Sequence, residues 1–189
     1  MKITVDDFIE VPEDRLLASV ATSYEALDGF VLRLAGKINS EDEYQPTESR
    51  PLILAVFRQL HFYASGTITI PENLDSMMSM AVSFTVMTVE LWDGFETDKN
   101  LDPSDMIQTV AQAYARFKID LYFGRVSSIL LESIGSVFDE EDSDLQGLST
   151  LQLGMLARLK KQTVRNKLAT KSEFKLSKYE SGKYFMNVE

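Results

Sequence analysis

The residues with the most suggestive chemistry form one short run between Lys160 and Lys167. Basic, amide and hydroxyl side chains fill this run, and Val164 is its single apolar member. Lysine and arginine bind phosphate oxygens, while arginine, glutamine, threonine and asparagine also hydrogen-bond base edges in a DNA major groove. Candidate DNA-contacting residues here are Lys160, Lys161, Gln162, Thr163, Arg165, Asn166 and Lys167.

The charge of the chain changes sign at the same place. Residues 148–189 contain 9 Lys and Arg against 3 Asp and Glu, whereas residues 1–147 contain 10 against 26. The overall pI of about 4.7 hides this division. A basic segment on an acidic body is typical of a module that binds nucleic acid or another anionic surface.

Two short helices are expected to position these side chains. Ser149 or Thr150 can cap the first helix, whose inner face would consist of Leu153, Leu156 and Ala157. A turn over residues 158–160 would lead into the second helix. There Val164 and Leu168, four residues apart, would face inward and leave the polar side chains outside.

This pattern resembles the helix-turn-helix family of DNA-binding proteins. The family pattern has a small residue where Gly154 stands, so that the helices cross closely. Its turn position is usually glycine but is Arg158 here, and a left-handed non-glycine residue costs roughly 1 kcal/mol. The apolar positions of the pattern are filled by Leu153, Ala157, Leu159, Val164 and Leu168.

The following residues are similar to those of winged members of that family. Residues 163–166 resemble the start of the recognition helix in excisionase-like and MerR-like regulators. Residues 174–179 alternate apolar and polar side chains as a half-buried strand does, residues 180–183 predict a turn, and residues 184–186 predict a return strand. The resemblance implies a β-hairpin wing whose Lys175, Lys178 and Lys183 contact phosphates.

The first 138 residues predict an acidic α-helical bundle. A helix start is expected at residues 11–14, where a proline precedes two acids. An apolar stripe then follows with spacings of three and four. Its residues are Leu17, Val20, Tyr24, Leu27, Val31, Leu34 and Ile38.

Three further helices complete the predicted bundle. One covers residues 52–63 and is stopped by Gly66, the next begins near Leu74, and the last begins after Asp102-Pro103. The apolar pattern of the last allows it to continue to Phe138, with a kink near Gly124. The fold class is therefore mainly α, with a bundle at 1–138, an acidic linker at 139–147 and the basic module at 148–189.

Several classes of site have little support in the sequence. The chain has no cysteine and a single histidine, His61, so metal and cofactor sites are not expected. Neither a signal peptide nor a run of about 18 uninterrupted apolar residues is present, which favours a cytoplasmic protein outside the membrane. Glu90, Asp93 and Glu96 lie close together without a partner His or Lys, so an enzyme is not expected.

The sequence thus predicts a regulator that binds double-stranded DNA, with a recognition helix in the major groove. The bundle would form a homodimer or bind an effector or partner, because its apolar stripes exceed what one short bundle needs. The alternative is a protein-interaction adaptor whose basic module docks on an acidic partner or on the acidic body itself. Gln162, Thr163 and Asn166 favour DNA, since docking requires only charge.

Overall fold

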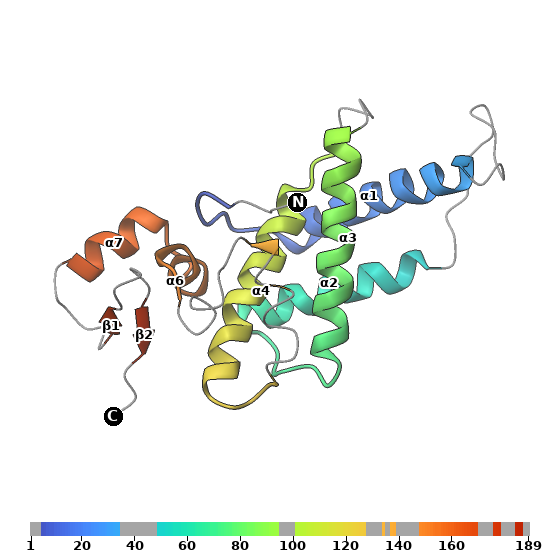
Figure 1. The fold of residues 1–189 in the computed structure, drawn as a ribbon. Coiled ribbons are helices and arrows are strands. Elements are labelled where there is room, and N and C mark those ends of the chain that lie inside the picture. Colours follow the sequence, from blue (N-terminus) through green and yellow to red (C-terminus); the bar gives the residue numbers. More distant parts are fainter. Residues whose placement is uncertain are drawn as a thin grey trace.

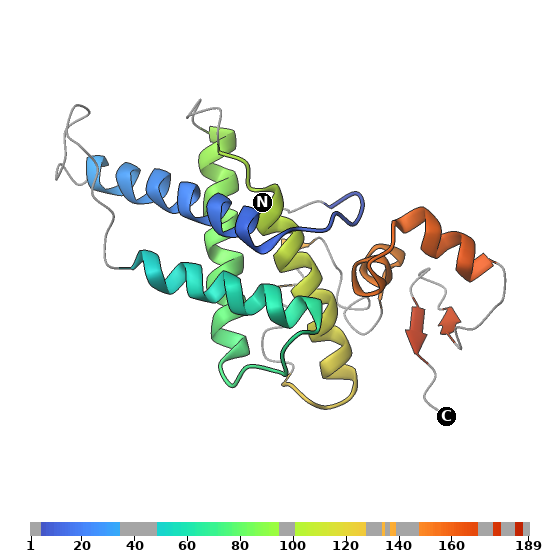
Figure 2. The same ribbon diagram turned by 180° about the vertical axis from the view of Figure 1, so that it is seen from behind.

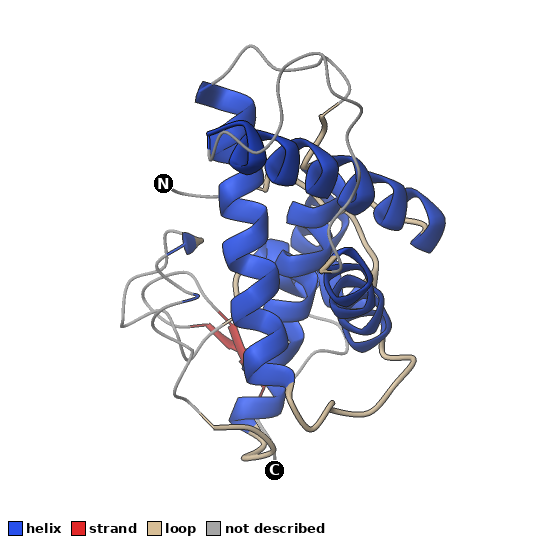
Figure 3. Cartoon of the chain, turned by 90° about the vertical axis from the view of Figure 1, so that its right-hand side faces the viewer, coloured by secondary structure: helices blue, strands red, loops and turns tan. Residues whose placement is uncertain are grey.

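The described chain is mainly α-helical, as the sequence predicted. The computed structural model describes residues 5–34, 49–94, 101–127, 134, 137–138, 148–169, 176–178 and 184–186 (Figure 1). The expected linker at 139–147 lies outside these residues, so the division into two domains stays a prediction. Figure 3 shows that the strands form one small hairpin in an otherwise helical chain.

Four long helices form the body, and two short ones lie beyond it. α1 and α2 run side by side and cross α3 and α4, while α6 packs against the far side of α4 (Figures 1 and 2). The elements are α1 (Glu13–Leu34), α2 (Arg50–Ser65), α3 (Leu74–Gly94), α4 (Ser104–Tyr122), α6 (Thr150–Ala157), α7 (Lys161–Ala169), β1 (Leu176–Lys178) and β2 (Tyr184–Met186).

Local sequence signals set the helix ends. Pro51 occupies the first turn of α2, where no amide donor is required. Gly66 ends that helix in the left-handed region at φ +80°, and its amide donates to the carbonyls of the last turn. At the start of α4, the Asp102 side chain accepts from the Ser104 amide at 2.9 Å. Helix ends of this kind are readable from sequence because the signal is local.

Aromatic side chains dominate the core of the body. Phe57 and Tyr63 of α2 and Tyr114 and Phe117 of α4 are essentially inaccessible to solvent. Phe84 of α3 packs edge-on against Phe57, with ring centroids 5.9 Å apart. Because aromatic side chains bury the largest apolar areas, this contact region contributes most to holding the four helices together.

The carboxylate of Asp120 is buried beside this core, with the residue at 2% exposure. The Tyr63 hydroxyl donates to its Oδ2 at 2.7 Å, and the guanidinium of Arg125 lies 3.2 Å from its Oδ1. Arg116 approaches at 3.7 Å and stacks over the Tyr63 ring. Burial raises the pKa of the Tyr63 phenol, and its hydrogen bond to Asp120 acts in the same direction. The buried carboxylate is therefore paired on both oxygens.

One expectation about the helices is wrong. α4 ends at Tyr122 rather than continuing to Phe138, because Gly124 adopts a left-handed φ of +65° next to the helix end. The apolar stripe of α1 is exposed at its last turns, where Val31 is 57% exposed and Leu34 73% exposed. That end of α1 lies to the side of α3 and α4 (Figure 1).

Within the described segments, one helix is long and apolar enough to cross a membrane by length and composition alone. It is the stretch Leu74–Leu91 of α3, with a mean hydropathy of 1.2. More than half of this stretch, 56%, is buried inside the structure. A helix from the middle of a bundle has the same properties, so the finding is weak evidence for a membrane span.

Candidate nucleic-acid interface

α6 begins with a complete capping box. The Ser149 side chain accepts from the Gln152 amide at 3.1 Å, and the Gln152 side chain accepts from the Ser149 amide at 2.8 Å. This arrangement satisfies two amides that a helix start leaves unpaired. α6 is then held against the body by Gln112 of α4, whose Nε2 donates to the Met155 carbonyl at 3.2 Å.

The turn between α6 and α7 has the geometry expected from the sequence. Arg158 caps α6 in the left-handed region at φ 53° and ψ 42°. The Leu159 amide then donates to the Gly154 carbonyl at 2.8 Å. A Cβ at position 154 would lie 2.7 Å from the Leu159 carbonyl oxygen, so only glycine fits this crossing without a shift of the backbone. The close approach expected at Gly154 is confirmed.

The inner face of α6 differs from the expected one. Met155 and Gln152 are buried, whereas Ala157 is exposed and Leu153 and Leu156 are only partly buried. The reason is that α6 packs on two neighbours, α7 on one side and α4 on the other. The expected face accounted only for α7, since nothing local in the sequence indicates the contact with α4.

α7 buries Val164 and leaves most of its polar side chains exposed to solvent. Val164 is 7% exposed and packs near Gly154, as expected, and Leu168 is partly buried. The Gln162 Nε2 donates to Asn166 Oδ1 at 2.9 Å along the outer face. Lys161 is partly buried, and the exposed candidate residues are Lys160, Gln162, Thr163, Arg165, Asn166 and Lys167.

An acidic residue far away in sequence lies at the start of α7. The N-terminal strap (residues 5–12) runs from α1 toward α6 and α7 (Figure 2). Asp7 in this strap accepts from the Lys161 backbone amide at 2.7 Å and from the Phe8 amide at 2.9 Å. The hydrogen bond from Lys161 lowers the pKa of the Asp7 carboxyl below its ordinary 3.8, and the charges of Lys160 and Lys161 act in the same direction against burial. Asp7 thus caps α7 from outside.

Arg158 makes a second connection between the module and the body. Its guanidinium donates to the Ser65 carbonyl at 3.2 Å and lies 3.8 Å from the Glu10 carboxylate. Neither Asp7 nor Glu10 was a candidate from the sequence. The only available signal was the acidic N-terminus opposite a basic module, and charge alone does not pair particular residues.

For the hairpin that follows α7, the structure gives the backbone of its two strands. β1 and β2 pair antiparallel, with Leu176 opposite Met186, Ser177 opposite Phe185 and Lys178 opposite Tyr184. Both strands fall within the segments 174–179 and 184–186 expected from the sequence, whereas the expected turn at 180–183 lies outside the described residues. Of the lysines expected there, Lys175 and Lys183 lie outside the described residues, and Lys178 ends β1. The described part of the chain gives no position for their side chains.

Neither a metal-binding cluster in the described segments nor a similarity to known proteins indicates the function. Among the described residues, no group of three or more His, Asp or Glu side chains is arranged to hold a metal ion. Comparison of the chain with protein-family models, with curated proteins and with solved structures finds no match.

Proposed function

We propose that the protein is a DNA-binding regulator that inserts α7 into the major groove. The observation that carries the proposal is the crossing of α6 and α7 at Gly154, where the Leu159 carbonyl of the connecting turn leaves no room for a Cβ and Val164 of α7 packs at contact distance. Such a crossing fixes α7 at a defined angle with its polar face outward. A rigid, exposed helix of this kind is what helix-turn-helix proteins present to DNA.

The side chains on that face suit two different roles. Gln162, Thr163, Arg165 and Asn166 have donors and acceptors that match base edges. The lysines at 160, 161, 167, 175, 178 and 183 are suited to phosphates, which bind charge regardless of sequence. The Gln162–Asn166 hydrogen bond must open before either amide makes a bidentate contact with an adenine.

The acidic body supports the same proposal. Its excess of Asp and Glu repels phosphates, so attraction to DNA is confined to the module. The body would then dimerise, because paired half-sites are read by paired proteins. The exposed side chains of Val31, Leu34 and Leu52, at the same end of α1 and α2, offer an apolar surface for the second copy.

A second candidate function rests on the strap. Asp7 and Glu10 already contact the start of α7 and Arg158. Acidic residues thus occupy part of the basic module, which is how an acidic protein partner would bind an adaptor. The two functions make opposite demands on the outer face of α7, since base reading needs Arg165 and Asn166 while docking needs only positive charge.

Fluorescence anisotropy with a random and a selected duplex at two salt concentrations tests the proposal. Lys160→Ala and Lys178→Ala should each weaken binding to both duplexes and reduce the salt slope by about one unit. Arg165→Ala should cost about 1–3 kcal/mol on the selected duplex and less on the random one. Arg58→Ala, which removes an exposed cation of the body, is the matched control and should change neither.

Two outcomes would contradict DNA binding. One is the absence of duplex binding at low salt. The other is an equal effect of Arg165→Ala and Lys160→Ala on both duplexes, which would leave the adaptor as the better account. Val164→Asp buries a charge between α6 and α7 and should abolish binding through loss of the module while α1–α4 stay folded.

A further inference from the structure

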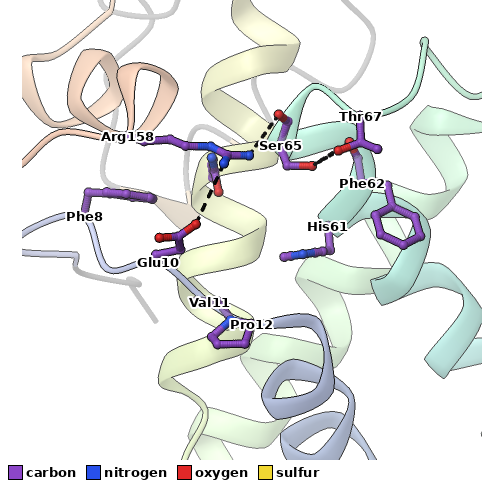
Figure 4. Close-up of a pocket in the computed structure, with 10 residues that line it drawn as sticks. Phe8, Glu10, Val11, Pro12, His61, Phe62, Ser65, Thr67 and Arg158 are labelled. Carbon is purple, nitrogen blue, oxygen red and sulfur yellow. Dashed lines mark hydrogen bonds and ion pairs between the residues drawn. The ribbon is translucent and has the colours of Figure 1, made fainter.

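A pocket of about 320 Å³ lies where the module meets the body (Figure 4). Four separate segments form its walls: the N-terminal strap, the end of α2, the middle of α4 and the turn at Arg158. This volume falls at the lower end of the range for small-molecule sites.

Apolar side chains line the pocket at its two ends. Phe8, Val11 and Pro12 of the strap lie at one end and below, and Phe62 of α2 lies at the opposite end. Two aromatic rings and two aliphatic side chains provide a surface for the hydrocarbon part of a ligand. A purely ionic ligand, such as free phosphate, would leave this surface unused.

Arg158 places a positive charge in the pocket, and the nearest carboxylate among the described residues is distant from it. Arg158 lies 3.8 Å from Glu10, longer than the 2.7–2.9 Å of a charge-assisted hydrogen bond. The Glu10 side chain is itself 74% exposed, so it can turn into solvent at little cost. The planar guanidinium is the side chain best suited to bind a carboxylate through two parallel hydrogen bonds.

His61 adds a polar but uncharged group. Its imidazole points into the pocket from α2 (Figure 4). Burial lowers the pKa of His61, Glu13 opposes this shift, and the positive charge of Arg158 adds to it. The imidazole is therefore neutral at pH 7 and can donate one hydrogen bond and accept another.

We propose that this pocket binds a small organic carboxylate with an aromatic or aliphatic body. The ligand carboxylate replaces Glu10 at the guanidinium of Arg158, and its apolar part lies between Phe8, Val11 and Phe62. His61 hydrogen-bonds the rim of the ligand. The site is independent of the DNA proposal, because no residue of the outer face of α7 takes part.

Three compounds of nearly equal size test the charge requirement. Phenylacetate, phenylacetamide and phenethylamine share the ring and the side-chain length but carry a negative, a neutral and a positive group. Isothermal titration calorimetry of the full chain at pH 7 should show phenylacetate binding with a Kd of about 1 mM or tighter. Phenylacetamide should bind about tenfold more weakly, and phenethylamine not at all.

Arg158→Gly gives the decisive variant. Glycine adopts the left-handed conformation of position 158 more readily than arginine, so the turn is retained while the guanidinium is removed. Affinity for phenylacetate should fall about tenfold or more. Thermal stability should change little, because the relief of left-handed strain offsets the lost hydrogen bond to the Ser65 carbonyl. Phe8→Ala should also weaken binding. Arg50→Ala, which removes an arginine of α2 distant from the pocket, should leave affinity unchanged.

The proposal is overturned by any of three results. The first is no binding of phenylacetate, the second is equal affinity for phenylacetamide and phenylacetate, and the third is full affinity in Arg158→Gly. Preference for phenethylamine would identify Glu10 rather than Arg158 as the charged group of the site. None of these measurements involves DNA, so they leave the regulator proposal to its own test.

Discussion

The four-helix body and the α6–α7 module keep their shape by different means. The body buries whole aromatic side chains and a paired carboxylate. The module has helices of 8 and 9 residues, too short to be stable alone, and few fully buried side chains. It relies on the crossing at Gly154, on packing against α4 and on the strap. The outer face of α7 can therefore stay exposed to solvent, because contacts on its inner face and at its N-terminus hold the helix in place.

The largest loss of stability is expected from a substitution at Asp120, inside the four-helix body. Asp120→Ala should destabilise the fold by about 3–5 kcal/mol, because it leaves the Tyr63 hydroxyl and nearby guanidinium groups without their acceptor. Denaturant unfolding followed by circular dichroism measures the effect. Asp120→Asn retains an oxygen acceptor for Tyr63 and should cost less. An equal loss in both variants would show that charge, not hydrogen bonding, matters at this position.

The module should respond most to Gly154. Gly154→Ala should destabilise the α6–α7 pair by about 1–3 kcal/mol, because its Cβ meets the Leu159 carbonyl oxygen. Amide hydrogen exchange should increase in α7 while α2 and α4 stay protected. Gly124→Ala is the control: Gly124 is left-handed, unlike Gly154, but has open space around its Cβ, so its strain should not reach α7. Uniform loss of protection would mean that module and body unfold as one unit.

The hydrogen bond from Lys161 to Asp7 of the strap should make a smaller contribution to stability, and this contribution should depend on pH. The pKa of Asp7 is lowered in the folded chain, so its contribution to stability is present above its ordinary value of 3.8 and is lost as pH falls through the folded value. The amide resonance of Lys161 should shift over that acid range in nuclear magnetic resonance spectra. In Asp7→Asn this shift should disappear, whereas Asp6→Asn should leave it in place. Persistence of the shift in Asp7→Asn would exclude Asp7 as its source.

The apolar end of α1 and α2 should show the smallest effect on folding. Leu34→Lys and Leu52→Lys change exposed side chains, so stability should stay within about 0.5 kcal/mol of the original. If these residues form the dimer contact, sedimentation at tens of micromolar should change from dimer to monomer. Met87→Lys, at an exposed position of α3, is the matched control. A protein that sediments as a monomer before substitution would contradict the dimer proposal.

Features that depend on neighbouring residues could be predicted from the sequence. The starts at Pro51 and Ser149, the stop at Gly66 and the turn at Arg158 are all set within a few residues. The hairpin strands follow from short-range alternation in the same way. For the candidate site, this was enough to place residues 161 to 167 on a helix and Val164 on its inner side.

Features that depend on contacts between distant segments could not be predicted from the sequence. The burial of Met155 in place of Ala157 follows from α4, more than thirty residues earlier in the chain. The exposure of Leu34 depends on how far the neighbouring helices extend, which periodicity does not report. Likewise, Asp7 and Glu10 carry no signal that assigns them to α7 and Arg158. Partner choice across the fold is a property of packing rather than of spacing.

The contact between Asp7 and Lys161 also has a consequence for how the protein is made. The two residues are 154 positions apart, so at ordinary rates of synthesis roughly ten seconds or more separate their departure from the ribosome. During that interval α1–α4 can assemble, but the strap has nothing to cap. The candidate interface is then completed last, after its support exists. A nascent chain arrested before Lys161 should thus contain a folded body whose strap is held by Gln108 of α4 while the Asp7 carboxylate has no helix to cap.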